Sequence, residues 1–249
     1  MTLSDIRLTV VVPAYNEASR IDASLTRILE YLNASPSSSE LIVVVDGSTD
    51  DTLRRAEAAQ PGRVSLRVIH SHVNHGKGFA VRQGMLAARG RYVLFSDTDL
   101  STPIEEAGRL VTAIEEGADV AIGSRSLAGS DVRVRQPLWR ESMGRAFNWF
   151  VQRLALPGII DSQCGFKCFR REAARRLFER QRLDGFAFDV EVLYLARVFG
   201  YRIVEVPVVW IDEPNSKVHP VRDSAQMLLD LARIRWRIRH GQYETPRDS

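Results

Sequence analysis

Apolar runs and helical stripes alternate along the first half of the chain. The runs favour valine and isoleucine, and they predict strands at residues 6–13, 41–45, 64–70, 91–96 and 119–122. Between the runs, apolar residues recur every three or four positions, as between Ile21 and Leu32, which predicts helices. This alternation predicts an α/β fold with a doubly wound, mostly parallel central sheet and with a ligand site at one edge.

The second half of the chain adds helices that are flanked by arginine. One apolar stripe after Arg140 predicts a helix that either packs on the domain or lies in a membrane interface: Met143, Phe147, Phe150, Val151 and Leu154. Residues 201–210 predict a strand, and Pro207 indicates that it lies at a sheet edge. The last predicted helix, 224–239, carries several arginines. Its alternatives are contact with an anionic membrane, a homodimer contact and a solvated face.

The composition is that of a globular protein with little net charge. The 249 residues are 45% hydrophobic, which is enough for a sizeable core, and the net charge is +3. The basic residues are not interleaved with stacking aromatic side chains, so nucleic acid is not an expected partner. We predict a single domain over residues 1–240, with a nucleotide-binding half at 1–125, an acceptor-binding half at 126–240 and a flexible tail at 241–249.

Neither the cysteines nor the N-terminal residues suggest export. Cys164 and Cys168 have no further cysteine partners, which is typical of a reduced, cytoplasmic protein. The first residues lack a basic segment followed by an apolar core, so no signal peptide is expected. No window approaches about 18 uninterrupted apolar residues, so no membrane span is expected either.

The segment 93–101, VLFSDTDLS, carries the strongest chemical signal. An apolar strand ends in two carboxylates, Asp97 and Asp99, at the sheet edge where ligands bind in such folds. Two oxygen ligands this close suit Mg²⁺ or Mn²⁺, which also take phosphate oxygens from a substrate. The alternative is a turn that leads into a helix cap at Ser101 or Thr102, before Pro103.

Other charged residues follow the neighbouring strands of the same predicted edge. They are Glu17, Asp46, Lys77 and Arg125, in addition to the two aspartates. A cation held by carboxylates, with basic side chains nearby, is how proteins bind a diphosphate and stabilise it as a leaving group. The chain has neither a GxGxxG nor a GxxxxGK[ST] motif. We therefore predict transfer from a diphosphate-activated donor.

Nine motifs resemble, in order, the family-2 inverting glycosyltransferases of GT-A fold. They are PAYNE, DGSTDDT, NHGKG, DTD and GSR in the first half, and DSQCGFK, GFAFDVE, EVPV and NSKV in the second. The second set resembles the polyprenyl-phosphate branch of this family, namely the dolichyl-phosphate glucosyltransferases and, more distantly, the mannosyltransferases. The resemblance covers residues 7 to 235. It implies transfer of glucose from UDP-glucose to a polyprenyl or dolichyl phosphate, at the inner face of the cell membrane and with peripheral contact.

The resemblance also implies a role for each matching residue. Asp97 would contact the nucleotide and, with Asp99, the metal and diphosphate, while Gln163 would lie near the donor sugar. Donor-binding positions would be Pro13, Ala14, Tyr15, Glu17, Asp46 and Lys77. The acceptor phosphate would meet Arg125, Arg140 and Lys217.

Departures from the family pattern and alternative reactions remain. Thr98 stands where the family often has alanine, and we expect it to point away with little effect. Asn215 replaces a usual glycine in the acceptor loop. A hydroxyl acceptor, or another donor such as GDP-mannose, is the alternative. A hydroxyl needs a general base, for which Asp189 is the first candidate and Glu191 the second; otherwise Asp189 only complements its helix. A sugar-nucleotide-forming nucleotidyltransferase and a non-catalytic binding module fit the motifs less well.

Overall fold

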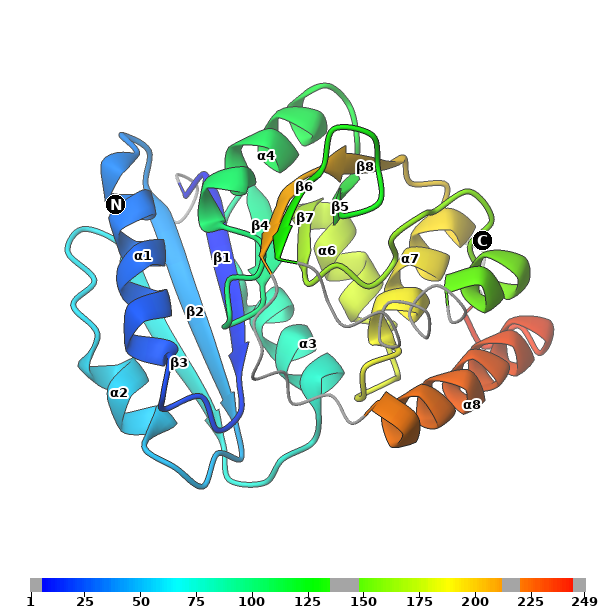
Figure 1. Cartoon of the computed structure of the whole chain (residues 1–249), viewed down its shortest axis with the longest axis horizontal. Coiled ribbons are helices and arrows are strands. Elements are labelled where there is room, and N and C mark those ends of the chain that lie inside the picture. The colour runs from blue at the N-terminus through cyan, green and yellow to red at the C-terminus, as the bar shows by residue number, and fades with distance from the viewer. Residues whose placement is uncertain (1–5, 135–147, 212–219, 244–249) are drawn as a thin grey trace, which may run out of the picture.

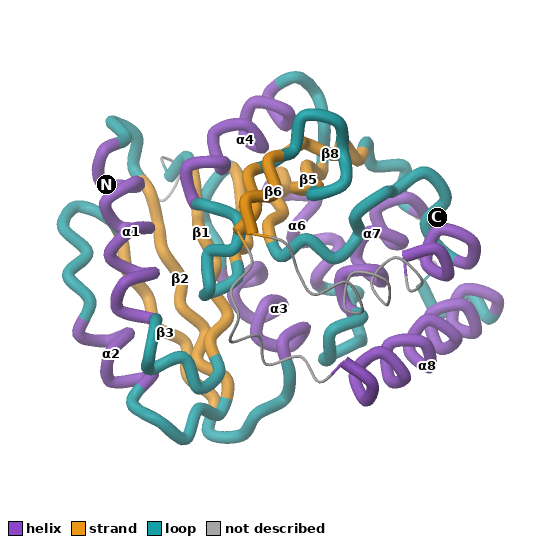
Figure 2. The backbone as a smooth tube through the Cα atoms, in the orientation of Figure 1, coloured by secondary structure: helices purple, strands orange, loops and turns teal. Residues whose placement is uncertain are grey.

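Helices cover both faces of one central sheet in the computed structural model, which describes residues 6–134, 148–211 and 220–243 (Figures 1 and 2). The sheet has seven strands in the order β3-β2-β1-β4-β7-β5-β8. Neighbouring strands are parallel except β7, which is antiparallel to β4 and β5. The predicted fold class, a doubly wound and mostly parallel α/β sheet, is confirmed.

The elements have the following bounds. The strands of the sheet are β1 (Leu8–Ala14), β2 (Ser39–Asp46), β3 (Ser65–Ser71), β4 (Tyr92–Ser96), β5 (Val120–Ser124), β7 (Phe166–Arg170) and β8 (Ile203–Pro207). The helices are α1 (Ile21–Ala34), α2 (Thr52–Ala58), α3 (Lys77–Ala87), α4 (Ala107–Glu115), α6 (Arg171–Phe178), α7 (Phe188–Val198) and α8 (Pro220–Arg239). A 3-10 turn, η1 (Ile104–Glu106), precedes α4. Residues 148–154 are also helical.

The central strands have nearly continuous apolar sequences because both of their faces are buried. In β1, Val10 and Val12 belong to the core under α1 and α4, whereas Val11 belongs to the core under α3, α6 and α7. Successive side chains of a strand point to opposite faces of the sheet, so a single strand contributes residues to two hydrophobic cores. The parallel strands β1, β2 and β4 end at a common edge, and the loops that follow them gather there (Figure 1).

The prediction of one strand over residues 201–210 is wrong. The chain forms β8, which ends at Pro207, and then β9 (Val209–Ile211), which pairs with β6 (Asp131–Val134) in a separate two-stranded sheet. Val208 lies between the two sheets, because its N–H donates to Ser124 of β5 and its carbonyl accepts from Asp131 of β6. The predicted edge position is confirmed, since β8 is the last strand of the large sheet.

Two predicted site residues lie outside the described part of the chain. They are Arg140, in 135–147, and Lys217, in 212–219. The helix predicted after Arg140 is described only from residue 148. Across the described ranges, no helix combines the length and the apolar character needed to cross a bilayer.

Candidate functional site

The loops that follow β1 and β2 are joined by hydrogen bonds. Asn16 accepts from the Thr49 N–H at 2.8 Å through its side chain, and its own N–H donates to the Ser48 hydroxyl at 3.0 Å. The Glu17 N–H donates to the Thr52 hydroxyl at 2.7 Å. The PAYNE and DGSTDDT motifs therefore form one continuous rim at the carboxyl edge of the sheet, with Tyr15 42% exposed on it.

Asp46 fastens the next loop to this rim. One oxygen of its buried carboxylate accepts from the backbone N–H groups of His75 and Gly76, both at 2.8 Å, and the other meets His75 Nδ1 at 3.1 Å. Gly47 has φ +68°, and a Cβ there would lie 2.1 Å from the backbone nitrogen of Asn74. The structure thus places Asp46 at the carboxyl edge of the sheet, where its carboxylate orients the NHGKG loop.

Asp97 sits between a lysine and a glycine. Its two oxygens lie 2.7 and 2.9 Å from Lys77 Nζ, at the first residue of α3. Its N–H donates to the carbonyl of Gly165 at 3.0 Å. A Cβ on Gly165 would lie 2.0 Å from Asp97 Oδ2, so only glycine leaves room for this carboxylate.

Thr98, between the two aspartates, is held by two hydrogen bonds. The Thr98 side chain is buried and points away, as expected, but its hydroxyl donates to the carbonyl of Pro13 at 2.6 Å. Its own carbonyl accepts from the Ser24 hydroxyl, also at 2.6 Å. Thr98 therefore ties the DTD loop to β1 and α1, an anchoring role that the sequence did not indicate. Asp99 accepts from the Ser101 N–H at 2.9 Å, a turn contact within the loop. The helix cap expected at Ser101 or Thr102 is not formed, because the 3-10 turn η1 begins after Pro103 and has no side-chain cap.

The charges around Asp97 and Asp99 are suited to binding a cation. Three ion pairs lie in this region: Lys77–Asp97, Lys167–Asp189 and Arg125–Asp161. Of the residues that the structure describes, no lysine or arginine forms an ion pair with Asp99. Burial and the nearby Asp97 charge raise the pKa of Asp99, which means that its negative charge is under-compensated. Asp97 and Asp99 are thus chemically suited to hold Mg²⁺ or Mn²⁺, with further oxygen ligands coming from a substrate.

Asp189 is a buried ion-pair partner in the structure. Its Oδ1 lies 2.6 Å from Nζ of Lys167, which also donates to the carbonyl of Cys164 at 2.6 Å. Both side chains are at most 5% exposed. Burial raises the pKa of Asp189, and the nearby charges of Lys167 and Lys77 offset only part of that rise. The interpretation of Asp189 as a mere dipole complement at its helix end therefore misses its partner on β7.

Glu191, the second candidate base, is engaged through both oxygens. One accepts from the backbone N–H groups of Arg182 and Leu183, at 2.9 and 2.8 Å. The other accepts from the Tyr243 hydroxyl and lies 3.5 Å from Arg237 Nη1. The side chain is fully buried. Glu191 joins α7 to the 182–183 loop and to the C-terminal segment.

Arg125 and Gln163 both contact residues of the second half of the chain. The Arg125 guanidinium forms a two-pronged pair with Asp161, at 2.7 Å for each bond, and lies over the Trp210 ring. Burial alone would lower the pKa of Arg125, but the Asp161 carboxylate outweighs it and holds that pKa above its usual value. Gln163 contacts the Met227 sulfur on α8, at 3.8 Å.

Sequence reasoning missed Lys167 and Asp161 as parts of the site. Both lie inside the DSQCGFK motif, but their partners are remote in sequence, 22 residues away for Lys167 and 36 for Asp161. The rarity of lysine could have revealed Lys167. Only three lysines occur in the chain, and two of them, Lys77 and Lys167, form the ion pairs with Asp97 and Asp189. A lysine buried in the middle of a strand requires a carboxylate partner.

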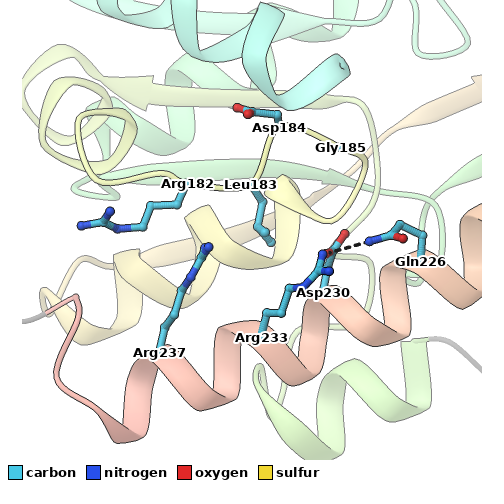
Figure 3. A pocket seen from close by; sticks show the side chains of 8 residues that line it. All are labelled: Arg182, Leu183, Asp184, Gly185, Gln226, Asp230, Arg233 and Arg237. Atoms are coloured by element: carbon cyan, nitrogen blue, oxygen red, sulfur yellow. Dashed lines mark hydrogen bonds and ion pairs between the residues drawn. The ribbon is translucent and has the colours of Figure 1, made fainter. Parts of the chain in front are cut away.

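An arginine-lined groove of about 310 Å³ lies between α8 and the segment that leads into α7. Figure 3 shows Arg233 and Arg237 projecting from α8 toward this segment, which begins at Arg182. Arg233 is paired with Asp230 at 2.7 Å. The same segment also contacts the start of α3, because the carbonyl of Asp184 accepts from the N–H of Gly78 at 2.7 Å.

Comparisons with known proteins give the family of this chain. A family model described as glycosyl transferase family 2 matches residues 9–178. A dolichyl-phosphate beta-glucosyltransferase from Dictyostelium discoideum is 39% identical, over 94% of this chain and 76% of that protein. One from Drosophila melanogaster is 38% identical, over 92% of this chain and 74% of that protein.

A solved structure shares the fold. Glucosyl-3-phosphoglycerate synthase from Mycobacterium tuberculosis, crystallised with Mn²⁺, UDP and glucosyl-3-phosphoglycerate, matches with a TM-score of 0.69 at 22% identity, over 92% of this chain and 80% of that chain. The family model covers more than half of the chain, and the relatives align with nearly all of it. This chain is therefore an enzyme of glycosyl transferase family 2.

Proposed function

We propose that this enzyme transfers glucose from UDP-glucose to a polyprenyl or dolichyl phosphate, with inversion at the anomeric carbon. Similarity to dolichyl-phosphate beta-glucosyltransferases over most of the chain supports the acceptor and the sugar. The joined loops after β1 and β2 would bind the nucleoside, with Tyr15 on the exposed rim. Arg125, Arg140 and Lys217 remain our proposal for the acceptor phosphate.

The single observation that favours a phosphate acceptor is that both candidate bases are buried and already bound to other groups of the protein. A hydroxyl acceptor must lose its proton to a base within hydrogen-bond reach. Asp189 is buried and paired with Lys167, and Glu191 is fully buried with both oxygens bound. A lipid phosphate is already anionic near neutral pH and attacks without a base. The geometry therefore suits an acceptor that brings its own negative charge.

Asp97 and Asp99 would hold the divalent cation of this reaction. When bound, such an ion neutralises the diphosphate and stabilises it as a leaving group. The chain itself orients these carboxylates, through the Thr98 bond to Pro13 and the close packing of Gly165. Attack from the side opposite the nucleoside diphosphate would give the inverted product.

We propose further that one face of the molecule contacts an anionic membrane at its cytoplasmic side. Large apolar side chains are exposed on residues 148–154 and on α8, and Trp149 and Trp236 are each more than half exposed. The two helices are linked by Arg235, which donates to the carbonyl of Leu154 at 3.3 Å. Exposed aromatic side chains beside arginines are typical of helices that bind the surface of anionic bilayers.

A donor and acceptor screen tests the proposed reaction. Purified enzyme with Mn²⁺ is incubated with UDP-glucose, UDP-galactose or GDP-mannose, and with a short polyprenyl phosphate or the matching polyprenol. Mass spectrometry then identifies the product. We expect hexose transfer to the phosphate from UDP-glucose, and none to the alcohol.

The Asp99→Ala variant and excess EDTA are the controls for the metal. Each should reduce transfer by at least about a hundredfold, because each removes the cation that stabilises the leaving group. Efficient transfer to the polyprenol would instead support the hydroxyl alternative. Full activity in EDTA would contradict the metal role.

A further inference from the structure

Lys77 occupies an unusual position for a cation. It is the first residue of α3, where the positive end of the helix dipole disfavours a positive charge. Its ammonium is nevertheless held at 2.7 and 2.9 Å from the two oxygens of Asp97. Its charge also acts on Asp99 and Asp189. The lysine thus faces the most acidic part of the cluster against the preference of its own helix.

Lys77 and a metal ion would compete for the same carboxylate. An ion bound to Asp97 would lie within a few ångströms of the ammonium, at which separation like charges repel strongly in a partly buried site. Lys77 and Asp97 are only 21% and 31% exposed, so solvent screens this repulsion incompletely. Lys77 therefore supplies part of the charge compensation that the metal would provide.

A diphosphate changes this balance. It brings negative charge to the cluster and offers the flexible lysine chain a second anion within reach of the helix start. Metal and diphosphate then assist each other, since the diphosphate draws the ammonium away from Asp97 while the metal neutralises the diphosphate. Such mutual assistance is a coupling free energy between two ligands, and it must be reciprocal.

We propose that Lys77 is a positioning residue that couples metal binding to donor binding: by clamping Asp97 it keeps metal affinity low until a nucleoside diphosphate is present. The proposal rests on the proposed function only in taking UDP as the diphosphate. It explains why a cation is placed at a helix start that disfavours it, beside a residue suited to hold the metal.

Direct titration of Mn²⁺ tests this proposal without an activity assay. The electron paramagnetic resonance signal of free Mn²⁺ gives the dissociation constant for the wild type and for Lys77→Met, each with and without saturating UDP. Without UDP, we expect Lys77→Met to bind Mn²⁺ at least about tenfold more tightly than the wild type. With UDP, that advantage should shrink to less than about threefold or reverse.

Two further variants separate the specific effect from general ones. Lys77→Arg keeps the charge and should retain the weak Mn²⁺ binding of the wild type. Arg175→Met removes one positive charge from an exposed pair on α6 and should change nothing. A thermal unfolding scan of each variant checks that it is folded.

The remaining outcomes overturn the proposal. Lys77→Met that binds Mn²⁺ no more tightly than the wild type would show that the lysine does not compete with the metal. An equal gain with and without UDP would show that it does not couple the two ligands. Absence of Mn²⁺ binding in every variant, even with UDP, would also remove the metal from the proposed function, whereas the first two outcomes leave that function intact.

Discussion

At the scale of single residues, the candidate site depends on close packing around Asp97, which leaves no room for larger side chains. Gly165 packs against the Asp97 carboxylate, and Thr98 fixes the same loop from the other side through its bond to Pro13. A displacement of about 1 Å at a reacting centre costs on the order of a hundredfold in rate. Small changes behind Asp97 should therefore act on catalysis more than on folding.

Gly165→Ala tests this directly. The added Cβ would lie 2.0 Å from Asp97 Oδ2, so the carboxylate must move. We expect kcat/KM for transfer to fall about a hundredfold, while the enzyme remains folded in a thermal scan.

Gly108→Ala is the matched control for this variant. Gly108 lies in α4, and the nearest atom to an added Cβ there is 3.8 Å away. Its activity should be unchanged, and its stability unchanged or slightly higher, because alanine favours helix. If Gly165→Ala retains activity within about threefold of the wild type, the packing argument fails.

At the scale of elements, β7 links segments that are far apart in the chain. It lies between β4 and β5 in the antiparallel direction, and its Lys167 reaches Asp189 on α7. Removing one partner of a buried ion pair leaves an uncompensated charge, whereas replacing both by apolar residues is often neutral. The pair is therefore a structural link, in addition to its place beside the site.

A double-variant comparison measures this link. Lys167→Met should lower the free energy of unfolding by about 3–5 kcal/mol, because Asp189 is then buried without a partner. The double variant Lys167→Met/Asp189→Leu should recover most of that loss. Urea denaturation measures both. Equal losses in the single and double variants would contradict the proposed ion-pair role.

The pattern of the chain predicted the elements better than their partners. Strands such as β1, β2 and β4 were predicted because burial on both faces produces continuous apolar runs. The direction of β7 was not, since it depends on the long connection that precedes it rather than on its own residues. The pairs Lys167–Asp189 and Arg125–Asp161 were missed for the same reason, because proximity in space is not encoded by spacing along the chain.

At the scale of the whole molecule, the loops after β1 and β2 lie far from residues 148–154 and from α8, which carry exposed apolar side chains. Figure 1 shows α8 at the opposite end of the structure from α1 and α2. The arginine-lined groove lies between α8 and residues 182–185, and this segment contacts the start of α3. The membrane contact proposed for α8 would therefore lie beside this groove.

Vesicle binding tests this orientation. Replacing Trp149 and Trp236 together by alanine should weaken binding to anionic vesicles at least about tenfold, since each side chain would lose its apolar contact. Wild-type binding should also fall as salt is raised. Leu86→Ala, which removes an exposed apolar side chain from α3, is the control and should bind like the wild type. Unchanged binding of the double variant would place the membrane contact elsewhere.

A crystal structure with UDP and Mn²⁺ tests the central claim most directly. That claim is that Asp97 and Asp99 hold a cation, which in turn holds the diphosphate of the donor. An anomalous difference map should show Mn²⁺ within about 2.5 Å of oxygens from one or both carboxylates and from the diphosphate. A nucleotide or a metal peak bound away from these two residues would contradict the account.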